Sequence, residues 1–254
     1  MSIVKIHHRR ETEGGAGVEK EAESMVIQGL KRFSLLDYPG KIACSIFTAG
    51  CNFRCPYCYY KPLVIDTHEN KNIPVEDVYA FLEEYKGILD GVCLTGGEPL
   101  IQHGVEEFLQ HVRELGYEVK LETNGSFPDK LRRIVSEGLV SYVAMDIKNS
   151  PKSYGKTVGI QGYDLENVKK SVEFLLSDAV PYEFCTTVVL EYHQRSDFES
   201  IGKWIPNAKQ YYLQSFVNVE YVIRRGLHKY NDSIMEQALE IVRKDVPSAK
   251  LRGW

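Results

Sequence analysis

The feature that most constrains the fold is a regular alternation of short β-branched runs with amphipathic stretches of helical period, which starts near Met25 and continues almost to the end of the 254-residue chain. Each run with the stretch that follows it is typical of one βα unit. The expected strands are residues 42–48, 91–95, 117–122, 141–147, 182–190 and 209–214. The expected helices are residues 75–86, 104–115, 128–137, 165–177, 197–204 and 231–244.

A chain of repeated βα units folds as a parallel sheet, because right-handed crossovers bring each strand beside an earlier one. Six units indicate an open barrel. We therefore predict an α/β fold: a partial (β/α)6 barrel of parallel strands with outer helices, formed by residues 25–254. Residues 1–24 combine a basic run, a Gly-rich stretch and alternating charge with few large apolar residues, so we expect a disordered or appended N-terminal tail.

Composition excludes several classes of protein. The formal charge of -4 provides no electrostatic attraction for nucleic acid, and no apolar run approaches the roughly 18 residues of a membrane span. Because a signal peptide is not apparent either, we expect a cytoplasmic protein that binds neither nucleic acid nor membranes. In a reducing compartment the six cysteines are not a disulfide framework. Three of them lie in apolar runs and are expected to be small buried side chains: Cys44, Cys93 and Cys185.

The other three thiols follow the first expected strand with CxxxCxxC spacing: Cys51, Cys55 and Cys58. Thiolates select iron–sulfur clusters, zinc or Cu(I). An electron-transfer 4Fe-4S cluster takes four cysteines, so three leave one iron free to bind and activate a small molecule. A structural zinc site would need a fourth ligand at short spacing, and the nearest downstream histidine is the single His68. The spacing favours a catalytic cluster, with zinc and merely packed or reactive thiols as the alternatives.

The second expected strand ends in Gly96, Gly97 and Glu98, followed by a proline. Paired glycines let the backbone approach a ligand closely, and the carboxylate is an acceptor suited to an amine. An ordinary βα turn is the alternative. The third expected strand ends in Glu122 and Thr123, whose oxygens we expect at the barrel mouth, before a tight Asn-Gly turn.

The fourth expected strand ends with an acid and a base, Asp146 and Lys148. Because side chains alternate along a strand, residues two apart lie on the same face, so this pair should point together at the strand end. A purely structural ion pair is the alternative. The ends of the fifth and sixth expected strands carry weaker signals, which loop composition alone would explain.

Taken together, the cysteine motif, the Gly-Gly-Glu-Pro turn, Thr-Asn-Gly and Asp-x-Lys resemble the radical S-adenosylmethionine (SAM) superfamily. Further segments resemble its glycyl-radical-enzyme activases, closest to the anaerobic ribonucleoside-triphosphate reductase activating proteins: residues 33–41, 120–126, 143–148, 211–214 and 251–253. The chain departs from that family at three places. Tyr59 and Tyr60 stand where relatives carry His-Asn, Cys185 stands where they tend to have Arg, and Leu190 begins a segment that replaces a turn.

The resemblance implies that Cys51, Cys55 and Cys58 hold one 4Fe-4S cluster whose free iron chelates SAM. Reduction of such a cluster cleaves SAM to a 5'-deoxyadenosyl radical, which in activases abstracts a hydrogen atom from a glycine of a partner enzyme. No catalytic residue is expected beyond the cluster and the cofactor, because the protein mainly orients them. The residues expected to contact SAM are Tyr57, Gly96, Gly97, Glu98, Glu122, Thr123, Asp146 and Lys148.

The resemblance also names partners. We expect a glycyl-radical enzyme as the substrate, and the closer resemblance implies anaerobic ribonucleotide reductase. Because only one cysteine motif is present, the electron should come from an external donor such as flavodoxin or ferredoxin. Three alternatives stay open: a radical SAM enzyme that acts directly on a nucleotide or amino-acid derivative, a non-catalytic iron–sulfur or zinc module, and a family member with a lost or changed partner.

Overall fold

A computed structural model describes residues 25–253, so the tail expected at residues 1–24 lies outside the described residues and stays a prediction. The strands form one 8-stranded sheet in which each strand lies beside its neighbours in the chain. Strand β1 is antiparallel to β2, and every later strand is parallel to the one before it. The strands are β1 (Ile27–Ser34), β2 (Ala43–Thr48), β3 (Gly91–Gly96), β4 (Glu118–Thr123), β5 (Tyr142–Asp146), β6 (Tyr182–Val188), β7 (Tyr211–Ser215) and β8 (Lys250–Arg252).

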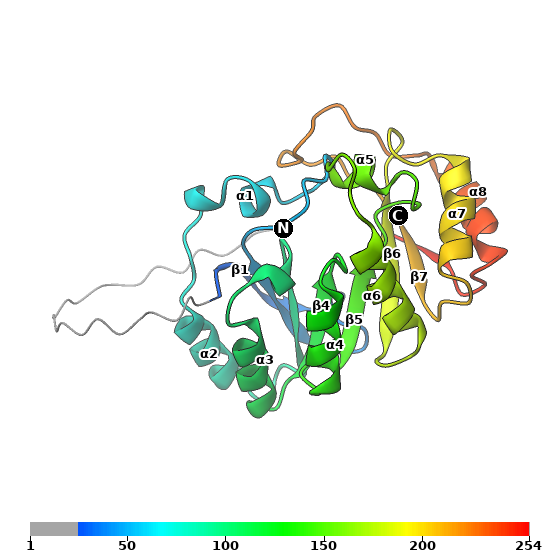
Figure 1. Cartoon of the computed structure of the whole chain (residues 1–254). Helices are drawn as coiled ribbons and strands as arrows, with labels where there is room; N and C mark the ends of the chain where they lie inside the picture. Colours follow the sequence, from blue (N-terminus) through cyan, green and yellow to red (C-terminus); the bar gives the residue numbers. More distant parts are fainter. Residues whose placement is uncertain (1–24, 254) are drawn as a thin grey trace.

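The sheet is open, since β1 and β8 are its two edges, and its longer helices lie on the outer side (Figure 1). These helices are α2 (Val75–Glu84), α3 (Val105–Glu114), α4 (Pro128–Ser136), α6 (Glu166–Leu176), α7 (Arg195–Trp204) and α8 (Asp232–Arg243). The short elements are α1 (Lys61–Val64), η1 (Thr67–Glu69), η2 (Pro99–Ile101) and α5 (Tyr154–Val158). The predicted partial barrel with outer helices is confirmed. Within residues 25–253, no helix combines the length and the apolar character that a membrane crossing requires.

The prediction of six strands was incomplete at both ends of the sheet. Strand β1 reads IQGLKRFS, where a glycine and two adjacent cations interrupt the alternation that marks a strand. Strand β8 has only 3 residues, too few to show a period. Both edges therefore depend on pairing with a neighbour, β1 on β2 and β8 on β7.

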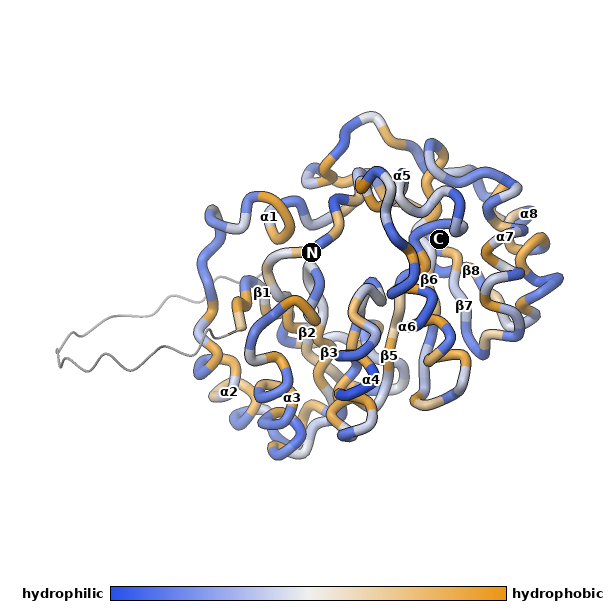
Figure 2. Tube along the Cα trace, in the orientation of Figure 1, coloured by the Kyte–Doolittle hydropathy of each residue, from blue (hydrophilic) through white to orange (hydrophobic). Residues whose placement is uncertain are grey.

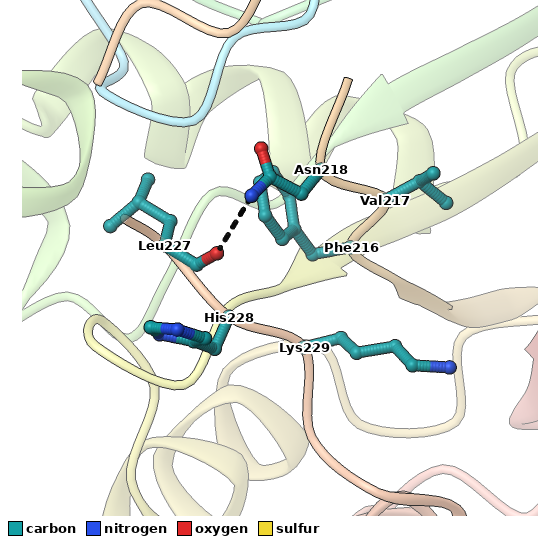
Figure 3. A pocket seen from close by; sticks show the side chains of 6 residues that line it. All are labelled: Phe216, Val217, Asn218, Leu227, His228 and Lys229. Atoms are coloured by element: carbon teal, nitrogen blue, oxygen red, sulfur yellow. Dashed lines mark hydrogen bonds between the residues drawn. The ribbon is translucent and has the colours of Figure 1, made fainter. Parts of the chain in front are cut away.

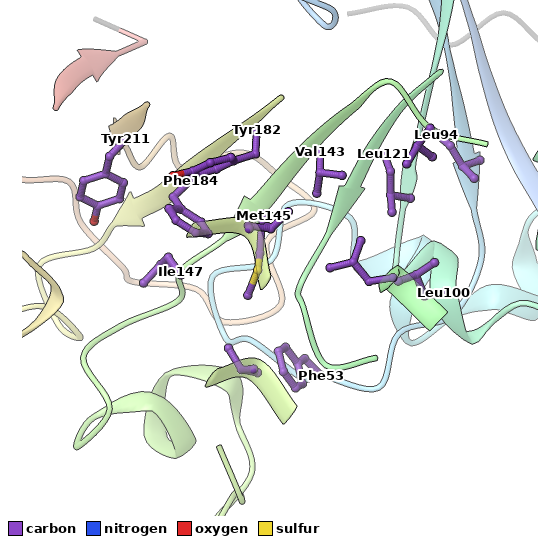
Figure 4. Packing of buried hydrophobic residues seen from close by; sticks show 14 of the residues in the cluster. Phe53, Leu94, Leu100, Leu121, Val143, Met145, Ile147, Tyr182, Phe184 and Tyr211 are labelled. Atoms are coloured by element: carbon purple, nitrogen blue, oxygen red, sulfur yellow. The ribbon is translucent and has the colours of Figure 1, made fainter. Parts of the chain in front are cut away.

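The two faces of the sheet differ in chemistry because successive side chains of a strand point to opposite faces. The convex face carries fully buried residues such as Leu94, Leu121 and Val143, which follow one another across neighbouring strands (Figure 4). The helices that cover this face alternate hydrophobic and hydrophilic residues along the tube in Figure 2, as amphipathic helices do. The intervening positions, among them Lys120 and Glu183, belong to the concave face. The C-terminal ends of β2 to β7 meet at one rim of this concave face.

Candidate active site

The three cysteines of the CxxxCxxC motif lie in the loop between β2 and α1. Cys55 is buried, and Cys51 and Cys58 are partly buried. The Phe53 amide donates to Cys51 Sγ at 3.3 Å, and the Cys58 amide donates to the carbonyl of Cys55 at 3.0 Å. Burial raises the pKa of Cys51 to about 11 and that of Cys55 to about 12, so the free thiols stay protonated at neutral pH. Bound iron would supply the positive charge that deprotonates them.

The three thiols are donors of the kind that an iron–sulfur cluster takes. Among residues 25–253, no group of three Cys, His, Asp or Glu side chains is arranged to hold one metal ion. Cys51, Cys55 and Cys58 would be the residues that hold such a cluster, which would supply one-electron chemistry there. The amide hydrogen bond to Cys51 Sγ is of the kind that stabilises cluster thiolates.

The Gly-Gly-Glu turn is built against the cysteine loop. Gly96 has φ +125°, which favours glycine, and a β-carbon on Gly97 would overlap the carbonyl of Gly50, the residue before Cys51. The Gly97 amide donates to the carbonyl of Thr48 at 2.9 Å, and the Glu98 amide donates to that of Gly50 at 2.9 Å. The turn therefore fixes where the cysteine loop leaves β2.

Glu98 is fully buried and binds the end of β4. Its carboxylate accepts hydrogen bonds from Thr123 Oγ1 at 2.7 Å, the Asn124 amide at 2.7 Å and the Leu100 amide at 3.1 Å. Burial nevertheless raises its pKa to about 7, because desolvation outweighs the hydrogen bonds. In this arrangement Glu98 joins the turn after β3 to the end of β4. Its contact with the methionine amine of SAM stays a prediction.

Glu122 and Thr123 point to different partners. Glu122 accepts a hydrogen bond from Thr95 Oγ1 at 2.8 Å and pairs with Lys120 at 3.0 Å on the concave face, whereas Thr123 donates to Glu98. The side chain of Glu122 is 39% exposed, so this carboxylate is accessible at the concave face. The structure therefore does not bring the Glu122 carboxylate and the Thr123 hydroxyl together at one site.

Asp146 and Lys148 form the predicted pair, with 2.7 Å between Oδ2 and Nζ. Burial lowers the pKa of Lys148, but Asp146, followed by the nearby Cys55 and Tyr57, holds it well above its usual range. The backbone at Lys148 is held in turn by the buried His193. The imidazole Nδ1 of His193 accepts from the Val189 amide at 3.1 Å, so Nε2 carries the proton and donates to the carbonyl of Lys148 at 3.0 Å.

Tyr57 is buried, and its hydroxyl has no hydrogen-bond partner among the described residues. Its ring lies 6.0 Å from that of Tyr192, measured between centroids. Because a buried hydroxyl normally finds a partner, this atom is available to a bound ligand at the cysteine loop. Cys185, the departure on β6, donates weakly to Gln214 Oε1 at 3.6 Å on the neighbouring strand.

Two asparagines that were not predicted connect β4 to the cysteine loop. Asn124 Nδ2 donates to Asn52 Oδ1 at 2.9 Å and lies 3.9 Å from Cys51 Sγ, while Asn52 Nδ2 donates to Ser126 Oγ at 2.8 Å. The Asn-Gly pair was interpreted only as a turn. The available signal was the cluster of polar residues at the end of β4, which consists of Thr123, Asn124 and Ser126.

The segment after β7, residues 216–231, crosses the cysteine loop, and we call it the strap. The rings of Tyr59 and Phe216 stack with centroids 5.7 Å apart, and the Val217 amide donates to the Tyr59 hydroxyl at 3.0 Å. The Ile223 amide donates to the carbonyl of Cys58 at 3.3 Å. A cavity of about 340 Å³ lies between the two ends of the strap (Figure 3). It is lined by Phe216, Val217, Asn218, Leu227, His228 and Lys229.

The family model described as the radical SAM superfamily matches residues 45–205, so the chain belongs to that superfamily. It is 29% identical, over 75% of its length and 80% of the relative's, to a protein of Methanocaldococcus jannaschii provisionally named a glycyl-radical enzyme activating enzyme. It is 27% identical, over 83% of its length and 92% of the relative's, to the 7-carboxy-7-deazaguanine synthase of Thermoplasma acidophilum.

Among solved structures, the fold is similar to that of Streptococcus suis SuiB bound to its precursor peptide SuiA. The TM-score is 0.65 at 13% identity, over 82% of this chain and 48% of that one. The resemblance to the radical SAM superfamily is thus confirmed, and the protein is a radical SAM enzyme, a class that uses a 4Fe-4S cluster and SAM.

Proposed function

We propose that this enzyme reductively cleaves SAM and generates a glycyl radical on a partner enzyme, with anaerobic ribonucleotide reductase as the partner. The observation that carries the proposal is the joint construction of two motifs. The Gly96–Gly97 turn leaves no room for a side chain beside Gly50, so it sets the path of the loop that carries Cys51, Cys55 and Cys58. Similarity to the activating enzyme of Methanocaldococcus jannaschii supports the activase class.

In this proposal the three cysteines hold the cluster. When bound, the cluster and SAM supply one-electron cleavage of a carbon–sulfur bond and a carbon-centred radical. The chain orients them. Asn124 and the Phe53 amide lie at Cys51, Tyr57 and Lys148 lie at Cys55, and the Gly96–Glu98 turn offers backbone groups to the methionine amine. Asp146, at 2.7 Å from Lys148 Nζ, keeps Lys148 charged.

The charges of the concave face favour a protein partner over a phosphorylated small molecule. Lys120 pairs with Glu122 at 3.0 Å, and both nitrogens of the Arg252 guanidinium end donate to Glu183 at 2.8 Å. Lys148 is paired with Asp146. A nucleotide phosphate needs several unsatisfied cations, and these three are already neutralised. An uncharged backbone segment, such as a glycine loop, makes no such demand.

A second candidate is direct action on a purine-like small molecule, which the 27% identity to 7-carboxy-7-deazaguanine synthase favours. One preparation of reconstituted protein distinguishes the two candidate functions. The protein is reconstituted anaerobically with iron and sulfide, reduced, and assayed with SAM for 5'-deoxyadenosine beside Cys55→Ala. We expect cleavage that requires Cys55, followed by a glycyl-radical spectrum when anaerobic ribonucleotide reductase is added.

Cleavage without any glycyl radical on the reductase, together with turnover of a deazapurine precursor, would support the second candidate. A reconstituted cluster that does not respond to SAM would overturn both. Bound iron and acid-labile sulfide are measured on the same samples, so that a failure of cluster assembly is distinguished from a failure of chemistry.

A further inference from the structure

We propose that exposed cations around Tyr192 form the docking surface for an acidic one-electron donor protein; this rests on the proposed function above. The surface, named here the Tyr192 patch, consists of Arg54, Lys156 and Arg224. They come from three segments, the cysteine loop, α5 and the strap. All three side chains are exposed. Figure 1 shows α5 and the strap at the same end of the molecule.

Two of the cationic groups contact Tyr192 directly, and the backbone of Arg54 is bound to the segment that carries Lys156. Lys156 Nζ lies 5.6 Å from the centroid of the Tyr192 ring, and Arg224 Nη1 donates to the Tyr192 hydroxyl at 3.2 Å. The Arg54 amide donates to the carbonyl of Val158, two residues after Lys156, at 2.9 Å. The Arg224 amide donates to the carbonyl of Pro56 at 2.8 Å, which fixes the strap to the cysteine loop.

The charge of the patch is not compensated within the described chain. None of the three cations forms an ion pair with a carboxylate of residues 25–253. Glu191, the acid next to Tyr192, is bound instead by His228, with 2.7 Å between the carboxylate and Nδ1. The whole chain carries a formal charge of -4, whereas the three side chains that define the patch are all cationic. Unpaired like charges held side by side attract a partner of opposite charge and accelerate its association.

The patch lies directly outside the cysteine motif. Tyr192 is only 6% exposed, and its ring lies 6.0 Å from that of Tyr57, which stands between Cys55 and Cys58. A donor docked over Tyr192 is therefore separated from the cluster cysteines by these two rings. In the transfer, one electron leaves the donor and one enters the cluster; no bond forms or breaks. The glycine substrate, in contrast, must reach the barrel mouth, where the radical forms.

The test compares the variants Lys156→Glu, Arg224→Glu and their combination with Lys203→Glu, which matches each single variant in charge change and lies on an exposed lysine near the C-terminal end of α7. Arg54 is left intact because its guanidinium donates to the carbonyl of Phe53 at 2.8 Å inside the cysteine loop. The probe is purified flavodoxin. Its binding to the oxidised protein is measured by titration, and cluster reduction by reduced flavodoxin is followed by stopped flow at low and high salt.

We expect the double variant to weaken flavodoxin binding and slow cluster reduction by about tenfold at low salt, with the difference shrinking at high salt. Reduction by photoreduced deazaflavin, a small reductant that needs no docking, should not change. Lys203→Glu should match the unmodified protein in both assays. Equal rates with flavodoxin, or equal slowing with both reductants, would overturn the proposal.

A loss of glycyl-radical formation under deazaflavin reduction would assign the patch to the substrate enzyme and also overturn it. None of the donor assays requires SAM cleavage or a glycine substrate. The docking proposal can therefore be wrong while the proposed function holds. Equally, the donor assays can support the docking surface even if no glycyl radical is formed.

Discussion

The two faces of the sheet are made by alternate residues of the same strands, yet they are organised by different forces. On β4, Leu121 points to the convex face and is fully buried, while its neighbour Lys120 points to the concave face and is held by acids. Apolar burial needs no directional partner and tolerates many sequences. The concave ion network needs specific partners, since each buried charge without one carries a desolvation penalty.

The concave charges also balance. Lys120, Lys148 and Arg252 face Glu122, Asp146 and Glu183, three cations against three anions. Such a network contributes little net stability relative to an apolar wall, but it holds each side chain in one position. The apolar convex face therefore supplies most of the net free energy of folding, whereas the ion network of the concave face fixes the arrangement of the site.

Among single substitutions, Glu183→Ala has the largest expected effect on stability. Glu183 is buried and serves both Arg252 and Lys120, so its removal leaves two cations without their shared acid. We expect the free energy of unfolding to fall by about 3–5 kcal/mol. Chemical denaturation measures it. The exposed acid Glu240, which pairs with Arg243, is the control, and Glu240→Ala should cost less than about 1 kcal/mol. Equal losses would show that the network is not a buried one.

On the convex face, Leu121→Ala should cost about 3 kcal/mol, from lost burial plus the cavity that remains. Because Leu121 lies on the opposite face of β4, this variant, unlike Glu183→Ala, should leave the ion network intact. Its unfolding free energy should therefore fall by a similar amount at every pH. A loss that depends strongly on pH would mean that the two faces are coupled and would contradict the division drawn above.

Much of this division could be predicted from the sequence. The six central strands carry β-branched periodicity, and the Asp146–Lys148 pair follows from spacing alone, because both residues belong to one local stretch. The partners of Glu98 could not be predicted, since Thr123 and Asn124 reach it only when two loops meet in space. The hydrogen bond between Val217 and Tyr59 joins residues 158 positions apart, and no local sequence pattern predicts it.

The ion network also predicts how stability depends on pH in acid. Burial alone would raise the pKa of Glu183, but hydrogen bonds from Arg252 and the charge of Lys120 lower it below the usual 4.5. A folded-state pKa below the unfolded value contributes stability above the unfolded pKa, and this stability is lost as the pH falls through the folded pKa. The unmodified protein should therefore lose stability below about pH 4.5. In Glu183→Gln, the free energy of unfolding should depend less on pH in this acidic range. Unfolding curves at a series of acidic pH values measure it, with Glu240→Gln as the control. If the stability of Glu183→Gln falls in acid as steeply as that of the unmodified protein, Glu183 is not the group whose protonation causes the loss.

The smallest expected effect lies at the rim where the two faces end. Tyr59→Phe keeps the ring stacked on Phe216 but removes the acceptor of the Val217 amide, which should cost about 1 kcal/mol. Because the strap is a surface segment, this cost should be local: hydrogen exchange at Val217 and Ile223 accelerates while global unfolding hardly changes. Tyr60→Phe is the control, since the Tyr60 hydroxyl has no hydrogen bond to the described residues. Unchanged exchange in Tyr59→Phe would mean that ring stacking alone holds the strap, and that Tyr59 acts through its ring rather than its hydroxyl.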